Sequence, residues 1–273
     1  MPEGHTIHRL AADYRDRFAG RRVRARSPQG TFAAGAARLD GQELREADAV
    51  GKHLFLGFGP GTGWVHVHLG LFGKVFFGVP DDDGGPAPVA TVRLRLSTGS
   101  DFADLRGPTR CALVTEPEKA AVAARLGPDP LRPGADPDRA WARVSRSRTP
   151  IATLLLDQKV VAGVGNVYRA EVLFRHGIDP LLPGRELTAR QWRAVWDDLA
   201  ALMAEGVRLG RIDTVRPEHT PEAMGRPPRV DDHGGEVYVY RRAERPCHVC
   251  AAPVRRAELA GRNLFWCPGC QKP

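Results

Sequence analysis

The sequence lacks any apolar segment long enough to cross a membrane. A spanning helix needs about 20 consecutive apolar residues, and polar or charged residues interrupt every stretch of this 273-residue chain before that length. No segment with the composition of a secretory signal precedes the first charged residues. We therefore expect a cytoplasmic protein that has no membrane partner.

Cysteine is nearly absent before residue 247, with Cys111 as the one exception. The remaining four form the spacing C-x2-C-x16-C-x2-C, and two such pairs can close a tetrahedral zinc site. A cytosolic chain would not normally use this cluster for disulfides. Four thiolates leave no open position for water, so the pattern predicts one structural Zn²⁺ per chain rather than a catalytic metal. The predicted ligands are Cys247, Cys250, Cys267 and Cys270.

Acidic residues are the minority among the charged ones. Asp and Glu number 32 against 40 Lys and Arg, which gives a formal net charge of +8. Much of this excess lies in Tyr238–Pro273, where six arginines and one lysine accompany only two glutamates. A basic surplus favours a polyanionic partner, most simply nucleic acid.

Periodicity separates a strand-rich first part from a helix-rich second part. The segment "TVRLRLS" (91–97) alternates Val92, Leu94 and Leu96 with arginines, which is the period of a half-buried strand. The apolar stretches "HLFLGF", "WVHVHLG" and "KVFFGV" are separated by glycine-containing breaks, so we expect hairpin-linked antiparallel strands within 50–115. Helical patterns replace strands after about residue 127.

Helix boundaries are indicated at several points of the second part. Thr149 is the expected N-cap of a helix with Pro150 at its first position. A second helix should end at Gly177. Thr188 and Gln191 predict a capping box at the start of a long helix. Residues 213–236 are rich in proline, glycine and charge, and we expect a mobile connection that is too polar to pack a core of its own.

The first residues, "MPEG", carry a possible nucleophile. Removal of the initiator methionine would leave Pro2 with a free secondary amine, and α-amines titrate near pH 8. Such an amine can attack C1′ of a sugar and form an iminium, which acidifies the C2′ proton and permits elimination of the 3′ phosphate. Glu3 is placed to act as a general acid. The dipeptide is short, so its significance depends on the rest of the chain.

Four further motifs accompany "MPEG": "GKHLF" (51–55), "HLGLFGK" (68–74), "LLLDQKVVAGVGNVYRAEVLF" (154–174) and "GRNLFWCPGCQ" (261–271). On these motifs the chain resembles, over essentially its whole length, the bacterial formamidopyrimidine-DNA glycosylase/endonuclease VIII family of base-excision repair enzymes. The resemblance implies an α+β multidomain fold. Its parts would be an N-terminal catalytic antiparallel β-sandwich (1–126), a helical domain with a helix–two-turn–helix motif plus the mobile loop (127–236), and a C-terminal zinc finger (237–273).

The resemblance also implies roles for single residues. Pro2 matches the Schiff-base nucleophile and Glu3 the proton donor. Lys52 matches a lysine that contacts phosphate and assists β-elimination. Asn166 matches a phosphate ligand in the turn between helices, where backbone amides at a helix N-terminus bind anions. Arg262 matches the zinc-finger arginine that grips phosphates around the lesion and is assigned to δ-elimination.

Four more residues are included as DNA contacts by the same resemblance. Arg125 matches an endonuclease VIII contact, and Lys159 lies in the longest motif. Leu71 occupies the position of the wedge that fills the gap left by a flipped base, with Phe72 beside it. The alternative for this pair is that both are hairpin residues packed on the core.

His66 and His68 share one face of a predicted strand. They suggest either a metal pair or side chains packed beneath the active site, and the second interpretation is favoured because no third ligand is evident nearby.

The function implied is a bifunctional DNA glycosylase/AP lyase. It would excise oxidised bases from double-stranded DNA through a Pro2 Schiff base, then nick the strand by β/δ-elimination, as a monomer associated with the bacterial nucleoid. "DLRGPTRC" (104–111) lacks the arginine–phenylalanine pair with which the formamidopyrimidine branch probes the opposite base, which favours the endonuclease VIII branch and oxidised pyrimidines. The alternatives are a relative specialised for bulky or crosslinked lesions, one with AP-lyase activity only, and a non-catalytic binder of damaged DNA.

Overall fold

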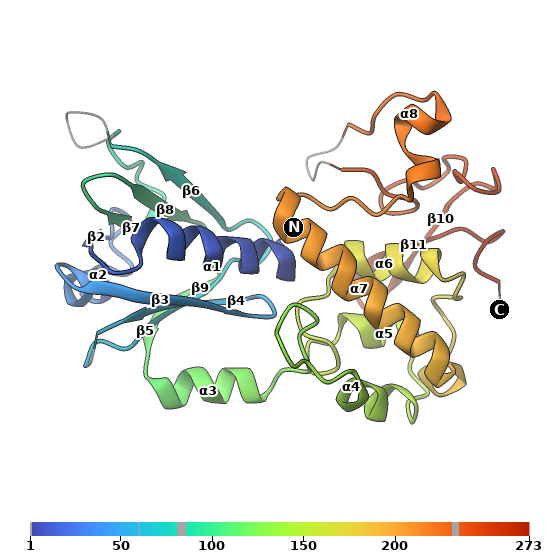
Figure 1. Ribbon diagram of the computed structural model, residues 1–273, viewed down its shortest axis with the longest axis horizontal. Coiled ribbons are helices and arrows are strands. Elements are labelled where there is room, and N and C mark those ends of the chain that lie inside the picture. Colours follow the sequence, from blue (N-terminus) through green and yellow to red (C-terminus); the bar gives the residue numbers. More distant parts are fainter. Residues whose placement is uncertain (1, 60, 81–85, 231–234, 273) are drawn as a thin grey trace. The chain divides into compact units, whose positions relative to one another are not determined.

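Hydrophobic residues at alternate positions build two antiparallel sheets in the first part of the chain (Figure 1). The computed structural model describes residues 2–59, 61–80, 86–230 and 235–272. One sheet has the strand order β1-β3-β4-β5-β9 and the other β2-β7-β8-β6. The strands are β1 (Arg21–Arg22), β2 (Arg24–Arg26), β3 (Glu43–Val50), β4 (His53–Phe58), β5 (Trp64–His68), β6 (Lys74–Gly78), β7 (Val92–Ser97), β8 (Phe102–Arg106) and β9 (Arg110–Val114).

The described residues form two compact units. Unit 1 comprises Pro2 and the described residues of Thr6–Arg125, and unit 2 comprises Glu3–His5 and the described residues from Leu126 onward. The three residues Glu3–His5 therefore belong by their contacts to unit 2, although they precede most of unit 1 in sequence. No helix in the described part of the chain is long and apolar enough to cross a membrane.

A helix that periodicity did not reveal contributes to the core of unit 1. Helix α1 (Gly4–Phe18) buries one face, and its buried residues recur at the helical spacing of three and four. They pack in one cluster with apolar residues of both sheets, which confirms the N-terminal β-sandwich. Helices α2 (Ala33–Leu39) and α3 (Glu116–Ala124) complete the unit.

The expected strand alternation is correct, but one connection differs from expectation. β4 and β5 form a hairpin, whereas β5 and β6 lie in different sheets, because β6 pairs with β8. The predicted β5–β6 hairpin is therefore wrong. In β7 the apolar residues face the core as expected, but Arg95 is also buried, in an ion pair with Asp104 at 2.6 Å.

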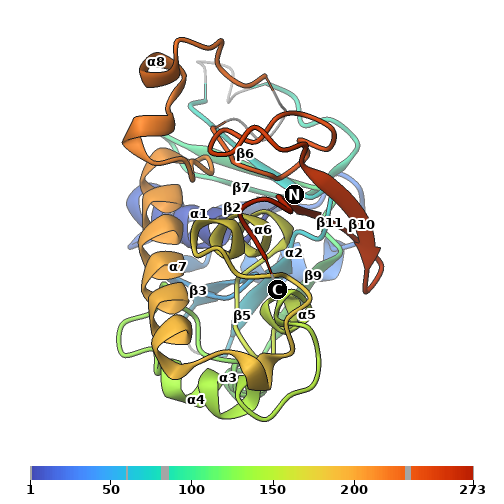
Figure 2. The ribbon, with the colours of Figure 1, turned by 90° about the vertical axis from the view of Figure 1, so that its right-hand side faces the viewer.

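Unit 2 is helical and ends in a two-stranded hairpin (Figure 2). Helix α6 contacts both α7 and β11 and lies between α7 and the hairpin. The short connection 157–165 joins α5 to α6 and forms the expected helix–two-turn–helix. The elements are α4 (Pro137–Val144), α5 (Ile151–Leu156), α6 (Asn166–Arg175), η1 (Gly184–Glu186), α7 (Ala189–Leu209), η2 (Pro217–His219), α8 (Pro221–Met224), β10 (Arg255–Leu259) and β11 (Arg262–Trp266).

Most helix signals are confirmed. Thr188 and Gln191 form the expected capping box of α7, and Gly177, with φ +62, follows the end of α6. The start of α5 is one residue later than expected: Pro150 is the N-cap and Ile151 the first helical residue, so the assignment of Thr149 as N-cap is wrong.

Candidate active site and nucleic-acid interface

Glu3 fastens the N-terminal end of the chain to the start of α6. The carboxylate is fully buried, and its two oxygens accept hydrogen bonds from the backbone N–H groups of Gly165 (2.7 Å) and Val167 (2.9 Å). These N–H groups are among the donors that a helix N-terminus leaves unpaired, and the helix dipole there favours negative charge. Pro2 precedes this anchor directly, so its nitrogen lies one residue from a fixed point of unit 2.

Two glycines allow this close approach. The N–H of Gly4 donates to the carbonyl oxygen of Gly163 at 2.8 Å. A Cβ at Gly165 would lie 2.3 Å from the Glu3 carboxyl carbon, and one at Gly4 would lie 2.9 Å from the Cα of Gly163. Gly4 and Gly165 therefore cannot carry a side chain without a clash, because the backbone of the first residues lies against the "GVGN" turn.

Asn166, the first residue of α6, is held in one orientation. Its Nδ2 donates to the carbonyl oxygen of Asn263 at 2.9 Å, and its Oδ1 accepts from Arg169. Both contacts together fix which side of the amide is the donor side. Arg262, the residue before Asn263, is exposed at the start of β11. Unit 2 thus brings the two phosphate ligands expected at Asn166 and Arg262 to neighbouring positions.

Lys52 lies in unit 1 at the tip of the β3–β4 hairpin. Val50 and His53 are paired across the strands, which leaves Gly51 and Lys52 as a two-residue turn. Gly51 has φ +58, the left-handed conformation that the first position of a type II′ turn requires. The lysine is half-buried.

Three histidines gather on β4 and β5 next to this turn. The Nδ1 of His53 lies 2.8 Å from the Nε2 of His66, and the rings of His53 and His68 are 5.0 Å apart between centroids. Burial, with positive neighbours including Arg110, lowers the pKa of His53 to about 4 and that of His66 to about 3. Burial and then the charge of Lys52 lower the pKa of His68.

Two conclusions follow from this cluster. The imidazoles of His53 and His66 are neutral at physiological pH, so Lys52 and Arg110 carry the positive charge of this region. A third histidine does lie nearby, contrary to expectation. Among the described residues, however, the only groups of His, Cys, Asp and Glu that converge on a metal position are the four terminal cysteines.

The residues expected to insert into DNA are exposed. Leu71 is 44% and Phe72 84% exposed, in the turn between β5 and β6. This exposure excludes the alternative that both pack on the core. Arg125 at the end of α3 and Lys159 in the turn before α6 are exposed as well, so both are available to a partner.

The four terminal cysteines converge on one point. Their sulfur atoms all lie within 4.8 Å of one another, with Cys247 and Cys270 3.8 Å apart and Cys250 and Cys267 3.3 Å apart. Zn–S bonds of about 2.3 Å in a tetrahedron separate the sulfurs by about 3.8 Å. The donor set therefore fits one closed, structural zinc ion.

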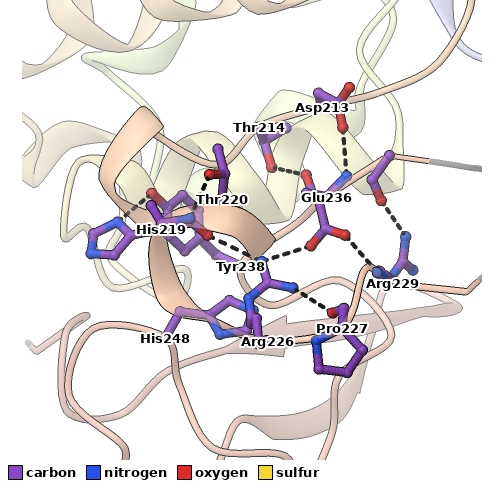
Figure 3. Close-up of polar contacts among 12 residues, drawn as sticks. Asp213, Thr214, His219, Thr220, Arg226, Pro227, Arg229, Glu236, Tyr238 and His248 are labelled. Atoms are coloured by element: carbon purple, nitrogen blue, oxygen red, sulfur yellow. Dashed lines mark hydrogen bonds and ion pairs between the residues drawn. The ribbon is translucent and has the colours of Figure 1, made fainter.

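The described residues between α7 and the zinc finger make specific polar contacts. The Tyr238 hydroxyl accepts from the N–H of Arg216 (2.8 Å) and contacts Nδ1 of His219 (2.9 Å), as Figure 3 shows. An ion pair of 2.7 Å joins Arg226 to Glu236. None of the described residues of 213–236 belongs to the buried hydrophobic core, which agrees with a segment too polar to pack a core of its own. Residues 231–234 of that segment lie outside the described part.

Three family profiles match the chain in order. They are the formamidopyrimidine-DNA glycosylase N-terminal domain (residues 1–111), the formamidopyrimidine-DNA glycosylase H2TH domain (126–217) and the zinc finger found in FPG and IleRS (245–273). Endonuclease 8 1 of Mycobacterium tuberculosis is 52% identical over 99% of this chain and 100% of its own length. The chain belongs to the formamidopyrimidine-DNA glycosylase/endonuclease 8 family. Its terminal cysteines are accordingly the ligands of a structural zinc ion.

Both branches of the family are similar to this chain. The formamidopyrimidine-DNA glycosylase of Parasynechococcus marenigrum is 32% identical over 99% of each chain. A solved structure of Lactococcus lactis Fpg with DNA containing an abasic site has a TM-score of 0.78 at 20% identity, covering 99% of this chain and 100% of that one. This structural likeness shows the fold.

Two residues of the site were not identified from the sequence. Arg169 stands three positions after Asn166, a spacing that places both on one face of a helix, and this could have suggested their contact. His53 could have been connected to His66 and His68 by pairing the predicted strands in register. No pattern indicated the contacts of Glu3 with the α6 N-terminus, because those partners are more than 160 residues away.

Proposed function

We propose that this chain is a bifunctional DNA glycosylase/AP lyase of base-excision repair that acts, as a monomer, on double-stranded DNA containing oxidised pyrimidines or abasic sites. The observation that carries the proposal is the anchored N-terminus. Glu3 follows Pro2 directly, and its buried carboxylate binds the N-terminal end of α6, the helix that begins at Asn166. A protein that only binds DNA has no need of a fixed terminal amine.

The reaction begins with the free secondary amine of Pro2. Its lone pair attacks C1′ of the damaged nucleotide, the bond from C1′ to the base breaks, and the base leaves with a proton. The nitrogen lone pair then breaks the bond from C1′ to O4′, and O4′ takes up a proton as the sugar ring opens. The opened sugar is an iminium, which acidifies the C2′ hydrogen. Loss of that proton expels the 3′ phosphate, and a second elimination expels the 5′ phosphate. Water then hydrolyses the iminium and releases Pro2.

The remaining residues have roles in positioning and proton transfer. Glu3 uses one lone pair of each oxygen for the backbone, so another lone pair is free to take up a proton and then give it to O4′ of the opening sugar ring. Lys52 and Arg262 bind phosphates, and Lys52 assists β-elimination while Arg262 assists δ-elimination. Asn166, Lys159 and Arg125 bind the DNA backbone.

Leu71 and Phe72 fill the space left by the extruded nucleotide. Their exposure supports this role, since an apolar pair of this size is costly to leave in water unless a partner covers it. We also propose that the three parts 1–126, 127–236 and 237–273 contribute the nucleophile, the backbone grip and the zinc finger, and that the protein works on nucleoid DNA in the cytoplasm.

The test is covalent capture. Protein with its native N-terminus is incubated with duplexes bearing an abasic site, 5-hydroxyuracil or 8-oxoguanine, and borohydride is added. We expect a reduced adduct, mapped to Pro2, on the abasic and pyrimidine duplexes. An uncleaved N-terminal extension converts the amine to an amide and should abolish capture, whereas the same extension at the C-terminus serves as the matched control.

The outcomes separate the alternatives. Capture on the abasic duplex alone would show a lyase without this glycosylase specificity. Strong binding without capture on any duplex, with zinc bound, would show a non-catalytic binder and contradict the proposal.

A further inference from the structure

A buried histidine bonds the residue that follows Lys52. His53 is the first residue of β4, and its Nδ1 lies 2.8 Å from Nε2 of His66. His66 is 2% exposed and stacks on Phe55, with the ring centroids 4.6 Å apart. No described residue bonds the other nitrogen of His53, Nε2, and this atom is not buried. The imidazole of His53 is therefore held at one nitrogen and open to solvent at the other.

The proton shared by the two histidines has one favourable position. Nδ1 of His66 is buried and bonds none of the described residues. If His53 donated from Nδ1, neutral His66 would carry its own proton on that buried Nδ1, and a buried donor without an acceptor is costly. If Nε2–H of His66 donates instead, only a lone pair is left unpaired, which proteins tolerate more often. His53 therefore accepts on Nδ1 and carries its proton on Nε2.

The surroundings of His53 keep its imidazole neutral. Burial, and then the charges of His68 on β5 and Arg110 on β9, lower the pKa of His53 to about 4. Asp48, a carboxylate of the neighbouring strand β3, is ion-paired with Lys119 at 3.2 Å. His53 consequently presents Nε2–H as an uncharged hydrogen-bond donor at physiological pH.

A histidine at position 66 is not needed for packing. A ring without nitrogen could stack on Phe55 equally well and would leave no buried polar atom unpaired. A buried polar atom that lacks a partner in a native protein calls for an explanation beyond packing. What the histidine adds is the hydrogen bond that orients the ring of His53 and fixes its tautomer.

Lys52 and His53 are complementary donors. The lysine ammonium is a point charge whose three protons rotate, so it attracts a phosphate without orienting it. The N–H of an imidazole has a direction that the ring fixes. A phosphate offers several acceptor oxygens, and hydrogen bonds to a charged acceptor are stronger than neutral ones. The two adjacent residues can thus bind one phosphate with charge from the first and direction from the second.

We propose that His53 is a directional ligand for the DNA phosphate that Lys52 binds, and that His66 is a positioning residue that keeps the donor of His53 on Nε2. The histidine limits the orientations that the phosphate can take on the lysine. This inference rests on the proposed function, in which Lys52 binds phosphate.

The experiment compares two substitutions of His53 that differ in one donor. His53→Phe keeps a ring and removes both nitrogens, whereas His53→Gln keeps an N–H close to the position of Nε2. His176→Phe is the matched control, because His176 is a partly buried histidine of unit 2 whose Nε2 lies 3.1 Å from Asp198, outside the proposed interface. For each zinc-loaded variant we would measure the Kd for a duplex with a tetrahydrofuran analogue of the abasic site, which Pro2 cannot cleave, as a function of salt and pH.

We expect His53→Phe to weaken binding about 10- to 100-fold, the range of one hydrogen bond to a charged group. The slope of log K against log salt should keep its native value, because an uncharged donor releases no counterion, whereas Lys52→Gln should make it less negative by about 0.9. The ratio of variant to native Kd should be the same at pH 6 and pH 8, since His53 is neutral at both. His53→Gln should keep most of the affinity, and His176→Phe should lower only the melting temperature.

Two-bond ¹H–¹⁵N correlation spectra of histidine-labelled protein test the role of His66. Native His53 should be the Nε2–H tautomer alone. His66→Phe keeps a ring on Phe55 but removes the bond to His53, so His53 should then populate both tautomers, and the affinity should fall by less than in His53→Phe. The spectrum of the native protein decides the tautomer even if His53→Phe does not fold.

The outcomes separate the two levels of inference. Native affinity in His53→Phe, or equal losses in His53→Phe and His53→Gln, would overturn the role of His53 as a donor. A salt slope that changes by about 0.9 in His53→Phe would show a cation instead of a neutral ligand and would overturn it as well. Native tautomer and affinity in His66→Phe would overturn the positioning role of His66.

None of these results affects the proposed function if borohydride captures the native chain at Pro2 on an abasic duplex. A native chain that neither binds the tetrahydrofuran duplex nor is captured on the abasic one would overturn both this inference and the proposed function.

Discussion

At the residue scale, Asp198 shows how a single carboxylate secures the end of α6. It accepts two hydrogen bonds from Arg175, at 2.7 and 2.8 Å, and lies 3.1 Å from Nε2 of His176. Burial opposes ionisation of Asp198, but the contacts with His176 and Arg175 together outweigh it and lower the pKa from 3.8 to about 2. The charged carboxylate is therefore a stabilising group of unit 2.

The sign of the pH dependence follows from the lowered pKa. A group whose pKa is lower in the folded state stabilises above its unfolded pKa, near 3.8, and this contribution is lost as the pH falls toward about 2. Asp198→Asn should thus reduce the free energy of unfolding by about 1–2 kcal/mol at pH 7, after discounting for partial solvent exposure. The difference from the native chain should shrink below pH 4.

Urea unfolding at pH 7, 4 and 2.5 checks this prediction. Asp197→Asn provides the control, since Asp197 is the neighbouring carboxylate and is exposed. Equal losses in the two variants, or a loss in Asp198→Asn that does not depend on pH, would contradict the assignment.

Single residues also show where sequence reasoning ends. The chemistry of Pro2 and the spacing of the cysteines can be recognised along the chain, because both are local. The partners of Glu3 cannot, since its carboxylate binds backbone N–H groups that become available only when α6 forms. The contact between Arg169 and Asn263 likewise requires the zinc finger to dock on α6.

At the element scale, local signals predicted helices and strands well and their partners less well. The capping box of α7 and the alternation in β7 are confirmed because each depends on a few adjacent residues. The sheet to which β6 belongs depends on a pairing with β8, which follows β7 in the sequence. The contact between Arg216 and the Tyr238 hydroxyl joins residues 22 positions apart, which composition does not reveal.

The zinc hairpin is the element whose stability depends most directly on a bound ion. Cys247 and Cys267 are buried, and they share one core cluster with Val254, Leu264 and the helices of unit 2. In zinc-finger peptides the metal contributes about 10–16 kcal/mol of apparent folding free energy. Removal of zinc should therefore unfold β10 and β11 before the helices, and it should abolish DNA binding through Arg262.

Hydrogen exchange of the peptides covering 245–272 is the direct measurement. We expect their protection to be lost after treatment with a chelator, while peptides of the β-sandwich keep theirs. The same chelator saturated with zinc is the control. Unchanged protection of the hairpin in metal-free protein would show that the cysteines do not hold a structural metal.

At the scale of the whole molecule, the net charge of +8 becomes a prediction about salt. Each phosphate neutralised by Lys or Arg releases counterions, and log K falls with log salt at a slope of about −0.9 per contact. The four proposed cationic contacts, Lys52, Arg125, Lys159 and Arg262, give a slope near −3.6, or about a 150-fold loss of affinity between 50 and 200 mM salt.

Charge-neutral variants test whether this slope comes from the proposed residues or from the general basic surface. Arg262→Gln should make the slope less negative by about 0.9. Arg24→Gln removes another exposed arginine, on β2, that is outside the proposed interface, and it should leave the slope unchanged. Equal effects of the two substitutions on the slope would mean that DNA binds the basic surface in general rather than at the proposed residues. A slope near zero for the native chain would contradict a DNA partner. A full effect for Arg262 alone would instead locate the backbone contact at the zinc finger, where buried Arg169 holds the adjoining residue in place.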